Sequence, residues 1–164
     1  MRLLKQAFFS ILFLAILVQV IALLFPSRII VSRAITIHAP ADSVRPYLQN
    51  MYGWQKWIAG MQDSAVHLHS QTQAQIGNRD VQIEKITSDS VVSVWHSAKS
   101  HLLISTMQML PASNGTATVV QWQYEQFLKW YPWERFGSLM SDKIIGGMLE
   151  QNLSRLQQLV EKQH

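Results

Sequence analysis

The sequence contains no cysteine in its 164 residues. Disulfides, thiolate metal sites and a cysteine nucleophile are therefore excluded. The net charge is also small: 14 Lys and Arg residues against 10 Asp and Glu residues give a formal net charge of +4. No run of basic residues with interleaved aromatic residues is present, and that pattern is the one expected of a nucleic-acid-binding surface. These absences argue against thiol chemistry and predict no nucleic-acid partner.

Motifs of catalytic and cofactor-binding sites are missing as well. The sequence has no Ser/His/Asp spacing, phosphate-cradling glycine loop or nucleotide-binding motif. His67 and His69 alternate on an expected strand, so both rings point to one face and could share a metal ion. No carboxylate or cysteine close in sequence completes that ligand set, and the simpler interpretation is two solvent-facing residues. We therefore predict no catalytic residue, no metal and no cofactor.

The N-terminal stretch Gln6–Ser27 has no charged residue. Residues 7–25 form an apolar run, and a helix of about 19 residues covers roughly 28 Å, close to the ~30 Å hydrocarbon core of a bilayer. A cleavable signal peptide is the alternative interpretation, since Arg2 and Lys5 form a short basic segment before the run. Against it, the run is longer than an ordinary signal-peptide core, and no small-residue cleavage site precedes Pro26.

The prediction is a retained transmembrane anchor over residues 1–27, with membrane contact through residues 7–25. One folded domain over residues 28–164 follows, because the remaining chain is long enough for a single real core and not for two.

The orientation of the anchor is predicted from the flanking positive charges, which collect on the cytoplasmic side. Arg2 and Lys5 precede the apolar run, whereas Arg28 and Arg33 follow it. A long folded domain contributes little to this rule, so the first pair is given more weight. We expect a single-pass protein of a bacterial inner membrane, with its N-terminus in the cytoplasm and its domain outside.

The middle of the sequence shows the two-residue alternation of β-strands. β-branched residues dominate residues 28–38, before Pro40 ends that expected strand. Residues 41–48 indicate a short helix that contains Pro46, and residues 54–57 a helical turn. Further strands are expected over 65–69, 80–86, 90–96, 102–110 and 116–127, with 70–77 either a loop or a weak edge strand. The short turns between consecutive strands predict an antiparallel meander.

Residues 132–161 form the longest helical pattern. Pro132 suits a first helical turn, and Glu134 in that turn favours the positive end of the helix dipole. Apolar residues then recur every three or four positions down one side as far as Val160. We expect one long amphipathic helix whose apolar side the sheet covers. The pair Gly146-Gly147 within it permits either a close approach by a ligand or strand, or a mild kink.

The segment RIIVSRAITIHAPADSVRPYLQNMYGWQKW resembles the opening of the START-like (SRPBCC) superfamily of polyketide cyclase/dehydrase and lipid-transfer proteins. Its first strand ends in an Ile-x-Ala-Pro turn at residues 37–40, and its W-x-x-W turn is Trp54 and Trp57. The later TATVVQWQYE is similar to a strand near the end of that fold, and the C-terminal segment to its closing helix. The resemblance covers about residues 28–161, and a version with a membrane span directly before the first strand also exists in this superfamily.

This resemblance implies an α+β helix-grip fold, in which a curved antiparallel sheet surrounds a long C-terminal helix. The segment SQTQAQIGNRDVQ departs from the superfamily pattern, which has a glycine- and tryptophan-rich strand pair there. Such a fold is hollow, and its cavity is expected to be mostly apolar. Aromatic and apolar residues of separate elements are expected to line that cavity: Trp54, Trp57, Trp95, Trp122, Tyr124, Met140, Ile144 and Met148.

The function predicted from these features is membrane-anchored binding or transport of a hydrophobic small molecule or lipid. A polyketide cyclase/dehydrase-like enzyme is the first alternative, with His96, His101 or Asp80 as acid or base. A non-catalytic interaction module is the second, with a cavity filled by large side chains. Whether the pocket is open, and whether a titratable group points into it, distinguishes the three hypotheses.

Overall fold

The computed structural model describes residues 2–96, 102–112 and 115–163. The helices are α1 (Arg2–Leu23), α2 (Ala41–Leu48), α3 (Met51–Trp54), α4 (Pro132–Gly137) and α5 (Ser141–Glu161), with a 3-10 turn η1 (Ser138–Met140) between the last two. The strands are β1 (Arg28–Ile37), β2 (Val66–Leu68), β3 (Gln73–Ile76), β4 (Arg79–Ile86), β5 (Ser90–His96), β6 (Leu103–Pro111) and β7 (Thr118–Phe127).

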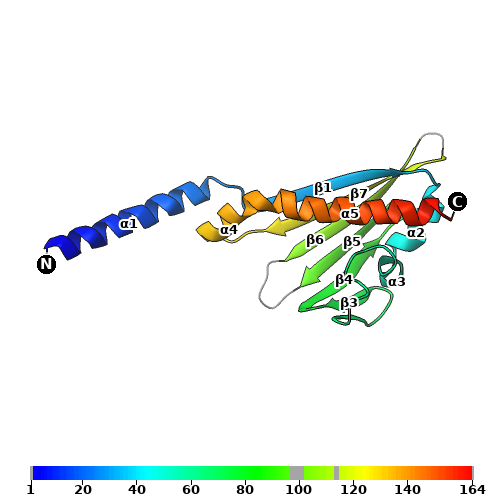
Figure 1. The fold of residues 1–164 in the computed structure, drawn as a ribbon, viewed down its shortest axis with the longest axis horizontal. Helices are drawn as coiled ribbons and strands as arrows, with labels where there is room; N and C mark the ends of the chain where they lie inside the picture. Colours follow the sequence, from blue (N-terminus) through cyan, green and yellow to red (C-terminus); the bar gives the residue numbers. More distant parts are fainter. Residues whose placement is uncertain (1, 97–101, 113–114, 164) are drawn as a thin grey trace.

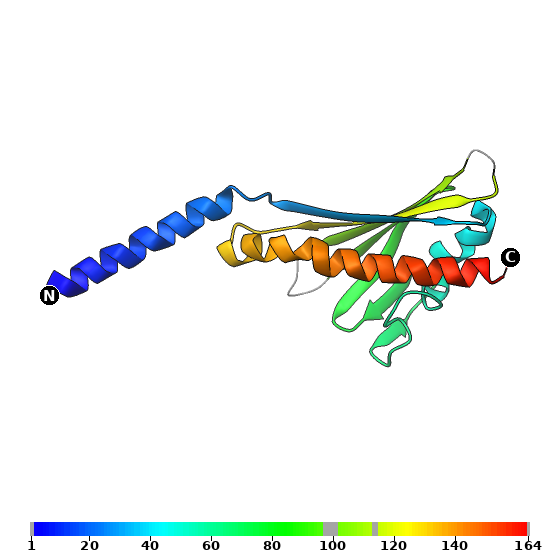
Figure 2. The same cartoon turned by 45° about the horizontal axis from the view of Figure 1, so that its top comes forward.

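All seven strands form one antiparallel sheet in the order β1-β7-β6-β5-β4-β3-β2. Strands β2 to β7 make the predicted meander, and β1 adds to its β7 edge. The sheet curves around α5, which lies across its concave face (Figures 1 and 2). The α+β helix-grip architecture is therefore confirmed.

Alternation along the strands decides which side chains face α5. In β7, Thr118, Val120, Trp122 and Tyr124 are buried, while the residues between them are only partly buried. From Leu149 onward α5 supplies the opposing layer, where Leu149, Leu153, Leu156 and Val160 are all buried. These two layers form the core of the domain.

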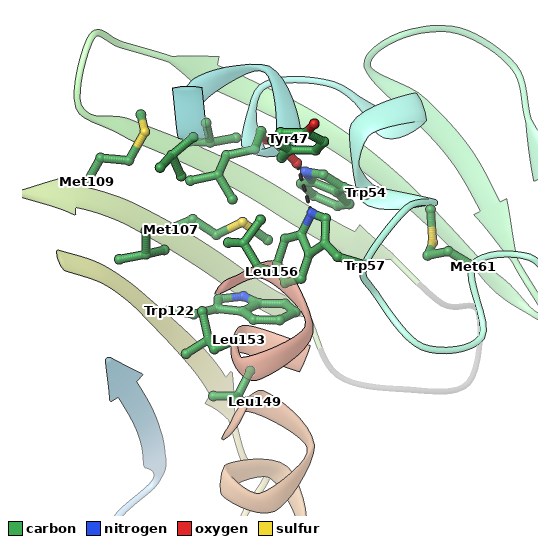
Figure 3. Close-up of a cluster of buried hydrophobic side chains, with 14 of the residues drawn as sticks. Tyr47, Trp54, Trp57, Met61, Met107, Met109, Trp122, Leu149, Leu153 and Leu156 are labelled. Carbon is green, nitrogen blue, oxygen red and sulfur yellow. Dashed lines mark hydrogen bonds between the residues drawn. The ribbon is translucent and has the colours of Figure 1, made fainter. Parts of the chain in front are cut away.

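Helices α2 and α3 close the end of the sheet that lies farthest from α1 (Figures 1 and 2). Trp54 is fully buried there, and its Nε1 donates to the Leu48 carbonyl oxygen at 2.7 Å. Trp57 Nε1 donates to the Tyr47 carbonyl oxygen at 2.9 Å (Figure 3). Both indole N–H groups are thus satisfied by backbone of the same region, as buried polar groups require.

The single long helix predicted for residues 132–161 is wrong in two respects. It is interrupted by η1, so α4 and α5 are separate helices. Its apolar side is also only half covered, because Phe136, Met140 and Ile144 are exposed. Periodicity identifies the apolar side of a helix but not how far along the helix a sheet extends. Residues 70–77, predicted as either a loop or a weak edge strand, contain β3.

Helix α1 contains one segment, Leu4–Leu23, that is long and apolar enough to cross a membrane by length and composition. An N-terminal signal sequence meets the same criterion. The end of α1 and the residues just after it contact α4 and the segment before it. Gln19 Nε2 donates to the Trp130 carbonyl oxygen at 3.1 Å, and the Phe25 and Phe136 rings meet edge to face at 5.4 Å. The Arg135 guanidinium donates to the Phe25 carbonyl oxygen. The apolar helix is therefore seated on the α4 end of the domain.

An ion cluster joins α5 to β1 beside the glycine pair. Arg33 Nε donates to Glu150 at 2.6 Å and its Nη2 to Asp142 at 3.1 Å. The hydrogen bond from Arg33 holds the pKa of Asp142 below its usual value. A Cβ atom at Gly146 would overlap the Arg33 guanidinium, whereas one at Gly147 would meet nothing within 4 Å. Gly146 therefore permits the close approach of a side chain from strand β1, so close approach rather than a kink explains this glycine.

The two adjacent glycines are expected to respond differently to alanine. Gly147→Ala should stabilise the protein by about 0.5–1 kcal/mol, because alanine is the better helix former. Gly146→Ala should gain little or nothing, because the added Cβ must displace the flexible Arg33 guanidinium and weaken its exposed ion pairs, which offsets the gain in helix propensity. Thermal unfolding of the full chain in detergent micelles, followed by circular dichroism, measures both. Equal shifts in the two variants would contradict the proposed packing of Arg33 against Gly146.

Candidate ligand-binding cavity

A cavity of about 530 Å³ lies between the sheet, α5 and the segment 58–65 that follows α3. Apolar side chains make most of its wall, including Ile58, Met61, Val66, Leu103, Trp122 and Ile145. Its volume lies within the ~300–1,000 Å³ range of small-molecule sites, and such sites are usually apolar with a few polar groups.

The sheet side of the cavity is aromatic. Trp122 and Tyr124 project from alternate positions of β7, and Trp95 projects from β5. The Tyr124 ring lies 5.5 Å from the Trp122 ring and 6.1 Å from the Trp95 ring, measured between centroids. The structure thus brings together four of the eight residues predicted to line a cavity, namely these three and Met148 of α5.

The other four predicted residues lie elsewhere. Trp54 is buried between α3 and α2, and Trp57 packs edge to face on the Trp122 ring at 5.2 Å (Figure 3). Trp57 therefore packs against the aromatic wall without lining the cavity. Met140 and Ile144 are exposed on the outer side of η1 and α5. The helix turns Ile145, the next residue, toward the cavity instead of Ile144.

Hydrogen bonds fix the two indoles of the aromatic wall. Trp122 Nε1 donates to Ser105 Oγ at 2.8 Å, and Trp95 Nε1 donates to Ser93 Oγ at 3.3 Å. Ser93 and Ser105 are themselves buried on neighbouring strands. These bonds satisfy the polar edges of the rings, so their apolar faces remain available to the cavity.

Tyr124 is the cavity residue whose ionisation is most perturbed. Burial raises the pKa of its phenol, while a hydrogen bond to Ser105 and the charge of Arg79 oppose that rise. The phenol therefore stays protonated at neutral pH and can act as a hydrogen-bond donor rather than a base. Asp63, Arg79 and Gln126 also line the cavity, and they are more exposed than Tyr124. The polar groups of the cavity thus include a neutral hydroxyl in its interior and charges nearer the solvent.

The acid and base candidates of the enzyme hypothesis lie away from this cavity. Asp80 and His96 pair across β4 and β5, whereas their neighbours Val81 and Trp95 face the concave side. Because successive strand residues point to opposite faces, Asp80 and His96 lie on the outer face. His101 lies outside the described residues. His67 lies in β2 and His69 directly follows it, and both are exposed.

Several lining residues were not anticipated. The segment 58–65 has no helical or strand periodicity, so its role as a wall carries no sequence signal. Asn152 is different, because it lies three positions after Leu149 and four before Leu156 on the buried side of α5. An amide within an apolar stripe indicates a buried polar contact. In the structure Asn152 Oδ1 accepts from the Ala59 backbone N–H at 2.8 Å, which ties the segment 58–65 to α5.

Solved structures with this arrangement are numerous and distant in sequence. A START superfamily protein from Mycobacterium smegmatis has 13% identity and a TM-score of 0.65, with 82% of this chain and 99% of that chain covered. An uncharacterised protein from Bacillus thuringiensis has 11% identity and a TM-score of 0.60, with 80% and 98% covered. Norcoclaurine synthase from Thalictrum flavum, in complex with dopamine and hydroxybenzaldehyde, has 10% identity and a TM-score of 0.62, with 84% and 88% covered. The fold is therefore START-like.

The family model for polyketide cyclase / dehydrase and lipid transport proteins matches residues 28–161. The chain belongs to this family. No curated protein matches the chain. Membership and fold together suggest the binding of a hydrophobic ligand, and the match begins directly after the apolar N-terminal helix.

Proposed function

We propose that the protein is a membrane-anchored carrier that binds a hydrophobic small molecule or lipid in the cavity between its sheet and α5. The observation that carries this proposal is the open apolar cavity of about 530 Å³. Each buried methylene contributes about 0.8 kcal/mol, so ten contribute ~8 kcal/mol, which corresponds to a Kd on the order of 1 μM before the costs of association. Burial of an acyl or isoprenoid chain is therefore the main source of binding free energy in such a cavity.

The anchor belongs to the same proposal. Residues 1–27 remain attached to the domain at residues 28–164, with the N-terminus in the cytoplasm of a bacterium and the domain outside the inner membrane. Support comes from the contacts of Gln19 and Phe25 with the α4 segment, which a cleaved signal peptide does not need. Arg2 and Lys5 at the start of α1 agree with this orientation. Retention keeps the cavity beside a reservoir of apolar molecules.

A carrier agrees with the geometry better than either alternative. The cyclase-type enzyme requires an acid or base in the cavity, and Asp80 and His96 face away from it. The filled-cavity module requires Trp95 and Trp122 to occupy the space that they instead border. Tyr124 and Asn152 are among the few polar residues of the lining that orient a bound molecule.

Filling the cavity is expected to remove its ligand. Ile145→Trp places a larger side chain into the cavity, while the matched variant Ile144→Trp places the same side chain outside it. In native mass spectrometry of the full chain, purified from membranes in detergent, wild type and Ile144→Trp should retain a bound apolar mass. Ile145→Trp should reduce its occupancy by about tenfold or more, because the added ring takes up the binding volume.

The result that contradicts the carrier is equally definite. If the wild type carries no additional mass and acquires none from an added lipid extract, the interaction module becomes the better hypothesis. Circular dichroism of both variants shows whether they remain folded, so that a lost ligand is not confused with a lost fold.

A further inference from the structure

An exposed apolar face runs along α4, η1 and the first half of α5. Its side chains recur at steps of three and four residues and lie on one side of the helices: Trp133, Phe136, Met140, Ile144 and Met148. Trp133 is 68% exposed and Ile144 is 67% exposed. At about 1.5 Å per residue the face is roughly 22 Å long. A continuous apolar surface of this kind marks a site of interaction.

The α4 end of this face meets the apolar N-terminal helix. Phe136 packs on Phe25, and the neighbouring Trp130 carbonyl oxygen accepts from Gln19, which lies within the segment Leu4–Leu23. If α1 spans a bilayer, residues bound to its last turns lie at the level of the lipid head groups. Exposed tryptophans are favoured at that level, and both Trp130 and Trp133 are exposed.

The other end of the face, at Met148 of α5, borders the cavity. Met148 is both exposed and part of the cavity lining. Beyond it, the positions on the same side of α5 are Gln151 and Arg155, which are exposed and polar. The helix surface therefore changes from apolar to polar at the level of the cavity. Gly147 adds no side chain beside Met148 and leaves the surface open there.

We infer that this apolar face is the route by which a chain-like lipid passes between the bilayer and the cavity. The inference rests on the proposed carrier function and assigns a path to it. One end of the face is seated at the membrane helix and the other borders the cavity, and the views show α4 and α5 continuing away from the end of α1 (Figures 1 and 2). An acyl chain moving along this face keeps apolar contact throughout and avoids full exposure to water.

A charge in the middle of the face tests the route. Ile144→Glu places a carboxylate there without changing the cavity lining, because Ile144 does not border the cavity. Ile86→Glu is the matched control, since Ile86 is also exposed but lies at the end of β4. The full chain is reconstituted in vesicles of phosphatidylethanolamine and phosphatidylglycerol. Donor vesicles then supply a long-chain fatty acid that carries a photoactivatable diazirine, and peptide mass spectrometry locates the adducts over time.

Wild type and Ile86→Glu should form adducts both along the apolar face and in the cavity. Ile144→Glu should slow the appearance of cavity adducts by about tenfold, because the passing chain must desolvate a charge, while their final level stays the same. An unchanged rate in Ile144→Glu overturns the route and leaves the carrier proposal intact. Absence of cavity adducts in the wild type overturns the carrier itself.

The same variant tests whether a second copy of the chain covers the apolar face. If light scattering shows that the wild type is a dimer and that Ile144→Glu is a monomer, the face is an interface between copies and the route is wrong. If wild type and Ile144→Glu have the same oligomeric state, the route is supported.

Discussion

Trp122→Ala is expected to lower the free energy of unfolding by about 3–5 kcal/mol. Trp122 is 1% exposed, its ring meets those of Trp57 and Tyr124, and its Nε1 bonds to Ser105. Truncation removes the transfer free energy of the indole and two aromatic contacts, each worth about 0.5–1.5 kcal/mol. The existing cavity beside Trp122 limits collapse of the surroundings, so the void stays large.

Urea unfolding of the full chain in detergent micelles, followed by circular dichroism, measures this loss. Trp133→Ala is the control, because that indole is 68% exposed and its truncation should change the stability by no more than about 0.5 kcal/mol. Trp122→Phe should fall between the two, since it keeps a ring but removes the bond to Ser105. A Trp122→Ala loss below about 1 kcal/mol would show that this ring is not a main element of the core.

Helix α5 serves the core and the cavity with different parts of one apolar side. Leu149, Leu153 and Leu156 pack into the closed end of the sheet, whereas Ile145 and Met148 border the cavity nearer to α1. The cavity is therefore held open between a well-packed end and the end that carries the apolar helix. A rigid core on one side allows the other side to remain hollow without loss of the fold.

Local pattern predicted the elements of the sheet closely. Strand β5 and helix α2 have the predicted bounds, and the other long strands differ by one or two residues. These strands could be predicted because two-residue alternation and β-branched residues within a segment are enough to indicate a half-buried strand. Helix α2 was likewise predicted from local sequence, and it is a short helix that contains Pro46 as expected.

The cavity was harder to predict, because its lining depends on long-range packing. Trp95, Trp122 and Tyr124 could be assigned from strand parity and a hollow fold. The choice between Ile144 and Ile145 could not, since a shift of one residue turns a helix position by about 100°. The segment 58–65 is tied to α5 by the side chain of Asn152, far along the sequence, and no local pattern reports such a contact.

That contact also suggests how the cavity wall can be opened selectively. Asn152 is 1% exposed and accepts the Ala59 backbone N–H at 2.8 Å. Asn152→Leu has a similar size but no acceptor, so the Ala59 N–H loses its partner. We expect a loss of about 1–3 kcal/mol of stability, the usual cost of a buried donor without an acceptor.

Hydrogen exchange of the full chain should locate the effect of this substitution. The Ala59 amide should exchange markedly faster in Asn152→Leu, while amides of β5 and β6 stay protected, because only the tie between segment 58–65 and α5 is lost. Asn152→Asp is the control that keeps an acceptor: its carboxyl oxygen still accepts from Ala59, so this amide should stay more protected than in the leucine variant even though burying the carboxyl lowers the overall stability. Unchanged exchange at Ala59 in the leucine variant would mean that the segment is held by its other contacts. Faster exchange together with lower ligand occupancy would show that one buried amide keeps the wall of the cavity closed.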